Sequence, residues 1–311
     1  ADINGKSYNA SSSTYKYSES ETRDLLYALN YSRKPTDGIR LDFDRSYYDI
    51  VKDYSANSKA LPHTTQPVSG TFTDSDGGWY TADLKVGRDL KWLGTHALNL
   101  GYHYDHYFVE NEGWNSANWK SAGSRTQLTS ADEGKTETNA LFLEDNWEMS
   151  QQWAVYLGGR CDWWKGFDGS KSRDTDSGRV VNPMPNRRDK SFSPKLATTF
   201  KPADDWSIRY SLGLATRFPT IGEIYFGGMN ATTGVLNVSN PGLKPENIIA
   251  NDLTVTKSFG WNTSTRLSFY QSDVDDAIYK QLNEITNQTS YENVDKVRTR
   301  GIELGLDTRD L

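Results

Sequence analysis

The chain has 311 residues, a formal net charge of -6 and 35% hydrophobic residues, and its mean hydropathy is -0.75. A helical membrane protein needs apolar runs of about 20 residues, and the sequence contains no such run. Charges of both signs are interspersed, which argues against the basic stripe of a nucleic-acid-binding protein. The 10 Trp, 18 Tyr and 11 Phe disfavour disorder, because disordered chains of low hydrophobicity lack aromatic side chains.

The ends of the chain and its cysteine content limit the organisation further. Residues 1–10 are polar and lack the apolar region of a signal peptide. The start in a Ser-rich stretch and the stop at Thr308–Leu311 predict that both ends are cuts through a longer protein. The lone Cys161 excludes an internal disulfide framework, and we interpret it as a small apolar strand residue.

Alternating apolar and polar residues recur along the chain, as in strands whose successive side chains point to opposite faces. In the clearest stretch, 206–218, every second position is mostly apolar or aromatic, and Arg209 and Arg217 lie among the other positions. An arginine facing lipid at the midplane costs about 2–4 kcal/mol, so both arginines are predicted to face inward. The same split is found in 25–32, 80–86, 98–104, 153–162, 192–200 and 301–307.

Short polar turns recur roughly every 55 residues, and much longer stretches rich in Gly, Ser, Asn and Asp lie between them. The short turns are expected at 33–38, 89–95, 148–152, 201–205 and 258–262. The long loops are expected at 46–78, 109–135, 165–190, 219–247 and 275–295. Short turns on one side and long loops on the other are typical of a transmembrane β-barrel of the bacterial outer membrane.

The predicted fold is therefore all-β, an antiparallel transmembrane barrel with its short turns in the periplasm and its long loops outside the cell. We expect about eleven strands of about 9–13 residues, against a usual strand length of about 5–6 residues. A half-buried sheet of a soluble protein also alternates, but it rarely keeps strands this long.

Four parts of the sequence resemble motifs of the TonB-dependent receptor family of outer-membrane transporters. Asn240–Glu246 reads NPGLKPE and Ala215–Thr220 reads ATRFPT, which resemble two segments at the end of a barrel strand and its following loop. The strands at 140–162 and 293–303 resemble two more, in family order, whereas residues 1–135 match by pattern only. The motif positions are Arg217, Phe218, Pro219, Glu223, Asn240, Pro241, Leu243, Lys244, Pro245 and Glu246.

The resemblance implies a 22-stranded barrel with a plugged lumen. It also implies an N-terminal plug domain and a periplasmic TonB box that takes energy from the TonB–ExbB–ExbD complex. We expect residues 1–311 to be one barrel domain, an internal fragment with about half of the strands and without the plug. The expected partners are outer-membrane lipid and lipopolysaccharide, the plug and the energising complex, and no nucleic acid.

Candidate ligand contacts are less clearly marked. His103 and Asp105 are predicted to share the lumen face, whereas His106 falls on the opposite face, so no metal site is predicted. His96 is expected on the periplasmic side. Loop aromatics can pack on a flat ligand and arginines can attract an anionic chelate, or the aromatics anchor loops or lie at the membrane interface. The predicted ligand-binding residues are His103, Asp105, Trp114, Trp119, Arg187, Arg188, Tyr225 and Phe226.

No nucleotide-binding or serine-hydrolase motif is present, so neither catalytic residues nor a cofactor are predicted. The resemblance implies TonB-dependent uptake of a scarce nutrient, with an iron–siderophore chelate as the first expectation. The resemblance implies a His between the two motifs in haem receptors of the family, and the loop 221–239 contains no His, which argues against haem. The alternatives are cobalamin, copper or zinc, haem or a glycan as cargo, a passive porin or enzymatic barrel, and a soluble secreted β-protein.

Overall fold

The computed structural model describes residues 2–3, 6–7, 18–36, 38–59, 66–229, 235–260 and 262–308. Most of the chain is in long strands. These are β3 (Ser18–Thr36), β4 (Ile39–Ser58), β5 (Gly70–Lys91), β6 (Thr95–Ser116), β7 (Arg125–Glu148), β8 (Trp153–Thr175), β10 (Arg187–Phe200), β11 (Trp206–Arg217), β14 (Glu246–Phe259), β15 (Thr263–Asn283) and β16 (Gln288–Thr308). The short elements are β1 (Asp2–Ile3), β2 (Lys6–Ser7), η1 (Ala122–Ser124), β9 (Gly178–Pro183), α2 (Ile221–Ile224), β12 (Gly228–Met229) and β13 (Leu236–Val238).

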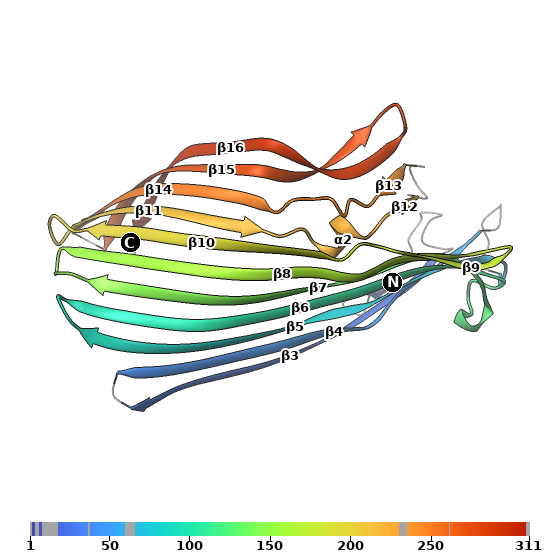
Figure 1. Ribbon diagram of the computed structural model, residues 1–311, viewed down its shortest axis with the longest axis horizontal. Coiled ribbons are helices and arrows are strands. Elements are labelled where there is room, and N and C mark those ends of the chain that lie inside the picture. The colour runs from blue at the N-terminus through green and yellow to red at the C-terminus, as the bar shows by residue number, and fades with distance from the viewer. Residues whose placement is uncertain are drawn as a thin grey trace.

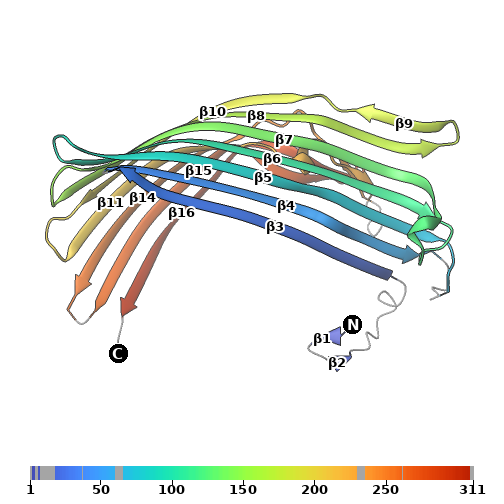
Figure 2. The ribbon, with the colours of Figure 1, turned by 90° about the horizontal axis from the view of Figure 1, so that it is seen from below.

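The long strands form one sheet in which each pairs antiparallel with its neighbours in the order β16-β15-β14-β11-β10-β8-β7-β6-β5-β4-β3. With β9, β12 and β13 the sheet has 14 strands, and β13 pairs parallel with β16. The sheet curls into an open trough whose two long edges are β3 and β16 (Figures 1 and 2). The predicted antiparallel architecture and number of long strands are confirmed. No helix within the described residues has the length and apolar character needed to cross a membrane.

The short turns lie together at one end of the sheet, as predicted (Figure 1, left). Residues 92–94, 149–152 and 201–205 connect β5 to β6, β7 to β8 and β10 to β11. Gly94 has a φ of 120°, and a Cβ at this position would lie 2.3 Å from the Glu148 carbonyl oxygen. This tight turn therefore requires glycine. His96 is at this end of the sheet, beside the Trp92 and Trp147 rings.

Four of the five predicted long loops are much shorter than expected, because the strands continue far beyond the alternating stretches, whereas the connection predicted at 219–247 falls between Arg217 and Glu246 as expected. The first loop shrinks from 46–78 to 59–69, the second from 109–135 to 117–124 and the last from 275–295 to 284–287. Within 165–190, β8 runs on to Thr175 and pairs with β9. Most of the long strands also exceed the predicted length, as β7 does with 24 residues, whereas β11 has the expected length with 12. The outer section of β8, residues 168–175, is polar on both faces, so alternation does not reveal it.

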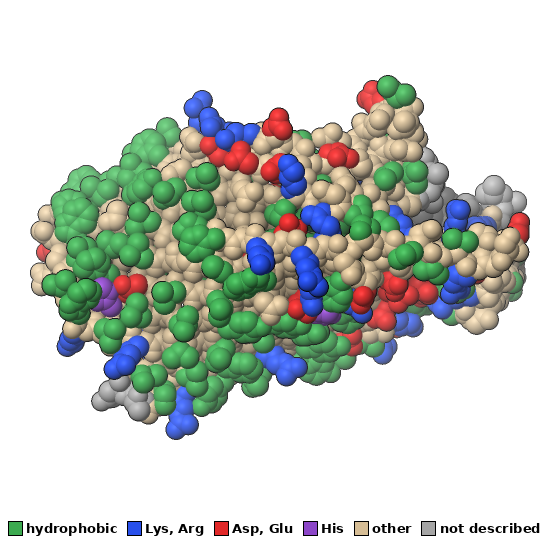
Figure 3. Space-filling view, viewed as in Figure 1, with side chains coloured by type: hydrophobic (Ala, Val, Ile, Leu, Met, Phe, Trp, Pro, Cys, Tyr) green, Lys and Arg blue, Asp and Glu red, His purple; other side chains and the backbone are tan. Residues whose placement is uncertain are grey.

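Cross-strand register confirms that the sheet has two unlike faces. On the outer face Leu100 pairs with Val86 and Leu143, and Leu100 and Leu143 are 57% and 54% exposed. On the inner face polar groups hydrogen-bond across strands, as Ser32 does with Asp42 at 2.6 Å. Figure 3 shows the outer face, where green side chains cover mainly the half nearest the short turns. This apolar band has the character of a lipid-facing surface.

Buried apolar packing lies beyond this band, at the opposite end from the short turns. One cluster surrounds α2 and contains Trp164, Ile221, Ile224, Tyr225, Leu243 and Ile278. A smaller cluster contains Ala56, Phe72 and Trp119. Among the residues that the structure describes, both clusters of buried apolar side chains therefore lie where the strands leave the band.

Candidate functional site

The connection from β11 to β14 places α2 against the inner face of the wall made by β7 and β8. The helix begins in a capping box, in which Glu223 N donates to Thr220 Oγ1 at 3.4 Å and Thr220 N donates to Glu223 Oε2 at 2.7 Å. This arrangement satisfies two backbone donors that a short helix leaves free. Ile221 and Ile224 are buried against the wall as a result.

Glycines in the wall make room for this helix. A Cβ on Gly134 would lie 2.5 Å from the Tyr225 ring, and one on Gly169 would lie 2.6 Å from it. A Cβ on Gly166 would lie 2.9 Å from Ile224 Cδ1. We call Gly134, Gly166 and Gly169 the glycine cradle. The fully buried Tyr225 lies in it and donates its hydroxyl to the Pro185 carbonyl at 3.2 Å.

Tyr225 was predicted to contact the ligand. In the structure its ring instead packs into the wall and is not presented to the lumen. Phe226 is only partly buried and packs at the edge of the same cluster. Ligand contact by Phe226 stays a prediction. The spacing of the cradle glycines gave no signal in the sequence, because they come from two strands.

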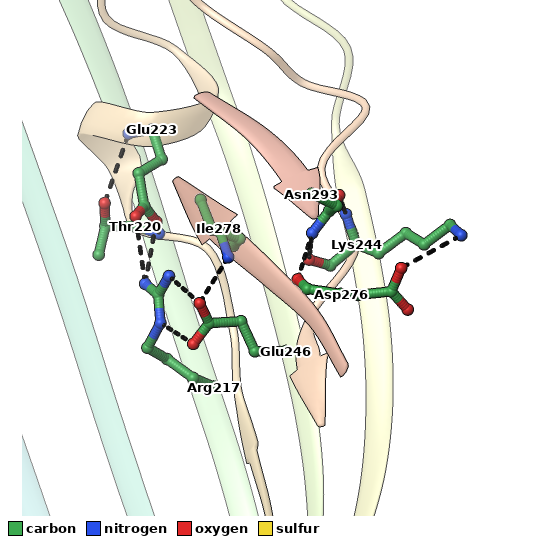
Figure 4. A network of polar contacts seen from close by, with 8 residues as sticks. All are labelled: Arg217, Thr220, Glu223, Lys244, Glu246, Asp276, Ile278 and Asn293. Carbon is green, nitrogen blue, oxygen red and sulfur yellow. Dashed lines mark hydrogen bonds and ion pairs between the residues drawn. The ribbon is translucent and has the colours of Figure 1, made fainter. Parts of the chain in front are cut away.

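Three charged motif residues join the strands around α2 (Figure 4). Arg217 binds Glu246 with two bonds, Nε to Oε2 at 2.5 Å and Nη2 to Oε1 at 3.0 Å, and its Nη1 lies 3.1 Å from Glu223 Oε2. Glu246 Oε1 also accepts from the Ile278 backbone N at 2.6 Å. We call Arg217, Glu223 and Glu246 the latch. It ties the end of β11, the helix, the start of β14 and β15 to one another.

The latch holds one predicted arginine and sets one charge state. Arg217 faces inward as predicted, and its guanidinium is bound within this chain. Arg209, the other inward arginine, makes a single 3.4 Å hydrogen bond to Thr199. The hydrogen bonds from Arg217 hold the pKa of Glu246 below its usual range.

The segment 240–245 is held by a second set of contacts (Figure 4). Asn293 accepts from Lys244 N at 2.8 Å and donates to the Lys244 carbonyl at 3.0 Å and the Asp276 carbonyl at 2.7 Å. Asn240 donates to the Tyr291 carbonyl at 2.8 Å, and Arg187 donates to the Pro241 carbonyl. The segment is thereby fixed to β15, β16 and β10.

The apolar motif positions complete this packing. Phe218 stacks on Trp164 with the ring centroids 5.6 Å apart. Pro219 and Leu243 are fully buried, whereas Pro245 is half-buried and Lys244 exposes its side chain. The ten motif positions predicted from the resemblance therefore lie in one region of the fold.

A cavity of about 570 Å³ opens on the inner face between this region and the wall. We call it the mouth cavity. Its lining is Asp105, Tyr107, Thr136, Thr138, Trp164, Thr216, Arg217, Phe218, Pro219, Thr220, Ile221 and Gly222. It combines aromatic faces with hydroxyls and a carboxylate, which suits a small organic ligand.

His103 lies beside this cavity and bonds to carboxylates through both ring nitrogens. Its Nδ1 is 2.7 Å from Asp83 and its Nε2 is 3.1 Å from Asp105. The expected pairing with Asp105 is thus present, and Asp83 is a partner that the sequence did not identify. His106 lies on the outer face, stacked on Tyr80 at 4.8 Å, as its position in the strand predicts. Across the described residues, no group of three or more His, Cys, Asp or Glu side chains is arranged to hold a metal ion.

The remaining predicted ligand contacts lie elsewhere. Trp119 is 4% exposed in the smaller core cluster, with its Nε1 donating to the Gln66 carbonyl at 3.0 Å, and Trp114 packs against the same cluster. Both indoles anchor the outer ends of β5 and β6. Arg187 and Arg188 were predicted to attract an anionic chelate from the loop expected at 165–190. They are neighbours in β10, so they project from opposite faces and do not face one ligand together.

Comparison with known proteins agrees with this architecture. The family model described as "TonB dependent receptor-like, beta-barrel" matches residues 2–309. An iron-regulated outer membrane virulence protein of Vibrio cholerae serotype O1 is 23% identical over 293 residues, which cover 84% of this chain and 40% of that protein. The chain therefore spans well under half the length of the curated relatives that it matches.

Solved structures show the same fold. The copper transporter OprC aligns with a TM-score of 0.70 and 16% identity, covering 94% of this chain and 45% of that chain. The siderophore receptor PiuA from Acinetobacter baumannii aligns with a TM-score of 0.65 and 15% identity, covering 93% of this chain and 45% of that chain. With its apolar outer band, polar inner face and motif-built mouth, this chain belongs to the TonB-dependent receptor family and lies in the outer membrane as part of the receptor's β-barrel.

Proposed function

We propose that this chain forms part of the barrel wall of a receptor. The receptor captures an iron–siderophore chelate outside the cell and imports it through the lumen. The observation that carries the proposal is the mouth cavity. Contacts of the latch and the cradle fold residues 218–229 and 235–245 over the inner face, and they leave a cavity of about 570 Å³ that opens toward the lumen. A rigid, partly aromatic cavity of this size suits capture of an organic chelate.

The prediction that the chain is not an enzyme agrees with its membership of a family of receptors. The charged motif residues are also paired with one another. Arg217, Glu223 and Glu246 form mutual ion pairs, which supports a role in shaping the site. Binding followed by transport is therefore the function that the geometry supports best.

Iron as the cargo is supported by the aligned relative, which is described as iron-regulated. The structural likeness to a copper transporter supports the shared fold, and nothing in the described residues favours a bare copper ion over a chelate. A chelate also presents flat organic surface, which matches the Tyr107, Trp164 and Phe218 rings around the cavity.

The proposed partners follow from the inner face. Polar side chains such as Arg209, Ser211 and Asp252 lie on its strands and need a polar or aqueous environment. We assign this environment to the receptor's own plug, and the energy for moving the plug to the TonB–ExbB–ExbD complex.

Uptake of radioactive iron by cells expressing the receptor tests the proposal. Cells given a panel of ferric siderophores under iron limitation should accumulate iron with at least one of them, and deletion of TonB should abolish the uptake. TonB-independent entry would identify a passive barrel. Uptake of cobalamin or copper in place of iron would identify another cargo.

A pair of variants connects the uptake to the mouth. Tyr107→Ala removes a 41% exposed ring that lines the mouth cavity, whereas Phe259→Ala removes a 52% exposed ring at the short-turn end. We expect the first variant to weaken ferric chelate binding about tenfold, since an aromatic contact contributes about 1 kcal/mol or more. The second should leave binding unchanged. Equal affinities of the two variants would contradict ligand capture at this site.

A further inference from the structure

Two groups of charged residues at the mouth cavity each hold more carboxylates than cations. Asp105 and Arg217 are the charged side chains among the described residues that line the cavity. The latch sets the Arg217 guanidinium against two carboxylates (Figure 4). Asp105 and Asp83 bond to the two ring nitrogens of His103 at 3.1 and 2.7 Å. Carboxyl groups are ionised at neutral pH, so each group has a net negative charge even when His103 is protonated.

Cations on the surrounding inner face do not offset this charge. Two of the arginines are paired within the chain, Arg187 with Asp189 at 3.1 Å and Arg160 with Asp162 at 2.8 Å. Arg209 is eight residues from Arg217 along β11, and Lys195 is opposite Gly213, four residues from Arg217. Even four residues of strand span about 13 Å, which exceeds the Debye length of about 8 Å at physiological ionic strength. The field at the cavity is therefore negative, and a cleft of one charge sign concentrates such a field.

Four side chains of the cavity are arranged to suit an ammonium group. Asp105 and Tyr107 lie two residues apart on the inner face of β6, directly opposite Thr138 and Thr136 on β7, and all four line the cavity. An ammonium has three N–H donors, for which the Asp105 carboxylate and the two threonine hydroxyls are acceptors. The exposed Tyr107 ring adds the attraction of an aromatic face for a cation. We call Asp105, Tyr107, Thr136 and Thr138 the ammonium seat.

We propose that the ammonium seat makes the receptor selective for ferric chelates that carry a free ammonium group, and that Asp105 determines this selectivity. The inference rests on the proposed function, because it names the class of chelate that the same cavity takes. A cationic chelate exchanges water for the Asp105 carboxylate and the Tyr107 ring. A polyanionic chelate loses water and meets carboxylate repulsion, since the cation at the cavity, Arg217, is already paired with two carboxylates. Selectivity is the difference between these two binding free energies.

Binding of chelates that differ only in charge tests the proposal on the whole receptor in mild detergent. Three probes share one ferric trihydroxamate scaffold: ferrioxamine B with its terminal ammonium, its uncharged N-acetyl derivative, and its N-succinyl derivative, which carries a carboxylate instead. A ferric tris-catecholate is the fourth probe and supplies a polyanion. We expect the ammonium form to bind at least tenfold more tightly than the N-acetyl form, because a hydrogen bond to a charged group contributes about tenfold or more. The N-succinyl form should bind more weakly than both.

The outcomes distinguish this inference from the proposed function. Equal binding of the ammonium and N-acetyl forms overturns the inference, and so does tightest binding of the tris-catecholate. Either result still agrees with uptake of a ferric chelate. Binding of none of the four probes also overturns the inference, whereas the proposed function fails only if the panel of ferric siderophores gives no TonB-dependent iron uptake.

Asp105→Asn locates the selectivity, because the amide keeps the shape of the side chain and still accepts from His103. The ammonium form should bind about tenfold more weakly to this variant, whereas the N-acetyl form should bind as before and thereby show that the cavity is intact. The matched control is Asp252→Asn, which removes an inward carboxylate of β14 six residues from Glu246 and should keep the preference. An unchanged preference in the Asp105 variant contradicts the assignment. If that variant does not fold, the comparison of the four probes on the unmodified receptor still decides.

Discussion

The membrane band and the mouth of this barrel wall are stabilised in different ways. In the band the large apolar side chains point outward and are exposed, as for Leu143 and Leu304 at 54% and 75%. In the mouth they are buried against one another, as for Ile224, Tyr225 and Leu243, each 0% exposed. Lipid supplies the apolar contacts of the band, whereas the mouth projects beyond lipid and needs a core of its own.

This difference predicts that truncating a large side chain is costly in the mouth and mild elsewhere. Tyr225→Ala empties the glycine cradle and leaves the Pro185 carbonyl without its donor, so we expect a loss of about 3–5 kcal/mol in the stability of the α2 region. Urea denaturation combined with protease cleavage within 218–245 measures it. The matched control is Tyr279→Ala on β15, whose side chain is 50% exposed. Similar losses for both variants would contradict the idea that the mouth has its own core.

The stability of the band should depend on where a charge is placed, whereas the stability of the mouth should depend on side-chain volume. Leu29 is 59% exposed on the outer face of β3, whereas its neighbour Asn30 faces inward and donates to Asp44. Leu29→Arg should destabilise the inserted barrel by about 2–4 kcal/mol, since the guanidinium faces lipid. Asn30→Arg places the same charge beside the Asp44 carboxylate and should cost little. Refolding yield and urea stability in lipid vesicles compare the two. If both cost the same, the assignment of the two faces of β3 is wrong.

The sequence predicted the band well because alternation is a local pattern. Strand faces, short turns and the inward arginines follow from residues two positions apart or from turn chemistry. The extent of the strands beyond the band was not predictable in this way. Sections such as the end of β8 are polar on both faces, and their strand pairing comes from backbone hydrogen bonds to neighbours far along the chain.

The site was predicted only in part, for a related reason. The motif positions were found by resemblance, and Arg217 and Glu246 turned out to bind each other. The glycine cradle depends on register between β7 and β8, which the sequence of either strand does not contain. Trp119 was predicted as a ligand contact because a loop aromatic can pack on a flat ligand, but a core outside the membrane needs such side chains too.

A smaller effect is expected from the latch. Arg217→Ala removes the cation between Glu223 and Glu246 and leaves two carboxylates close together, with a loss of about 2 kcal/mol. The loss is moderate because the Arg217 side chain is 37% exposed and solvent screens the pairs. Arg209→Ala, on the same strand and face, should cost much less because Arg209 makes one weak hydrogen bond. Protease cleavage within 218–245 should therefore accelerate only in the Arg217 variant. Equal cleavage rates in the two variants would indicate that the latch does not hold this segment.

The smallest expected effect is a pH dependence of the stability of the latch, which the buried packing around Tyr225 should not share. Glu246 lies beyond the band, since the last outward apolar residue on β14 is Ile249. Hydrogen bonds from Arg217 lower the pKa of Glu246 from the ordinary 4.5. A carboxyl with a lowered pKa stabilises the folded form fully above 4.5, and this contribution is lost as pH falls through the folded pKa. The segment 218–245 should therefore open more readily at pH 3.5 than at pH 7, by less than the Arg217→Ala effect.

Glu246→Gln isolates this carboxyl, because the amide keeps the shape and does not titrate. Hydrogen exchange of the Ile278 amide, which donates to Glu246 Oε1, reports opening directly. In the unmodified protein its protection should decrease between pH 7 and pH 3.5 beyond the intrinsic pH dependence of exchange. In the variant, protection should start lower and lose the part of its pH dependence that comes from Glu246. The Tyr225 core has no carboxyl at its centre, so Ile224 amide protection should stay nearly constant with pH. If Ile224 and Ile278 lose protection together, the latch and the core open as one unit, and the division of the mouth into two contributions is incorrect.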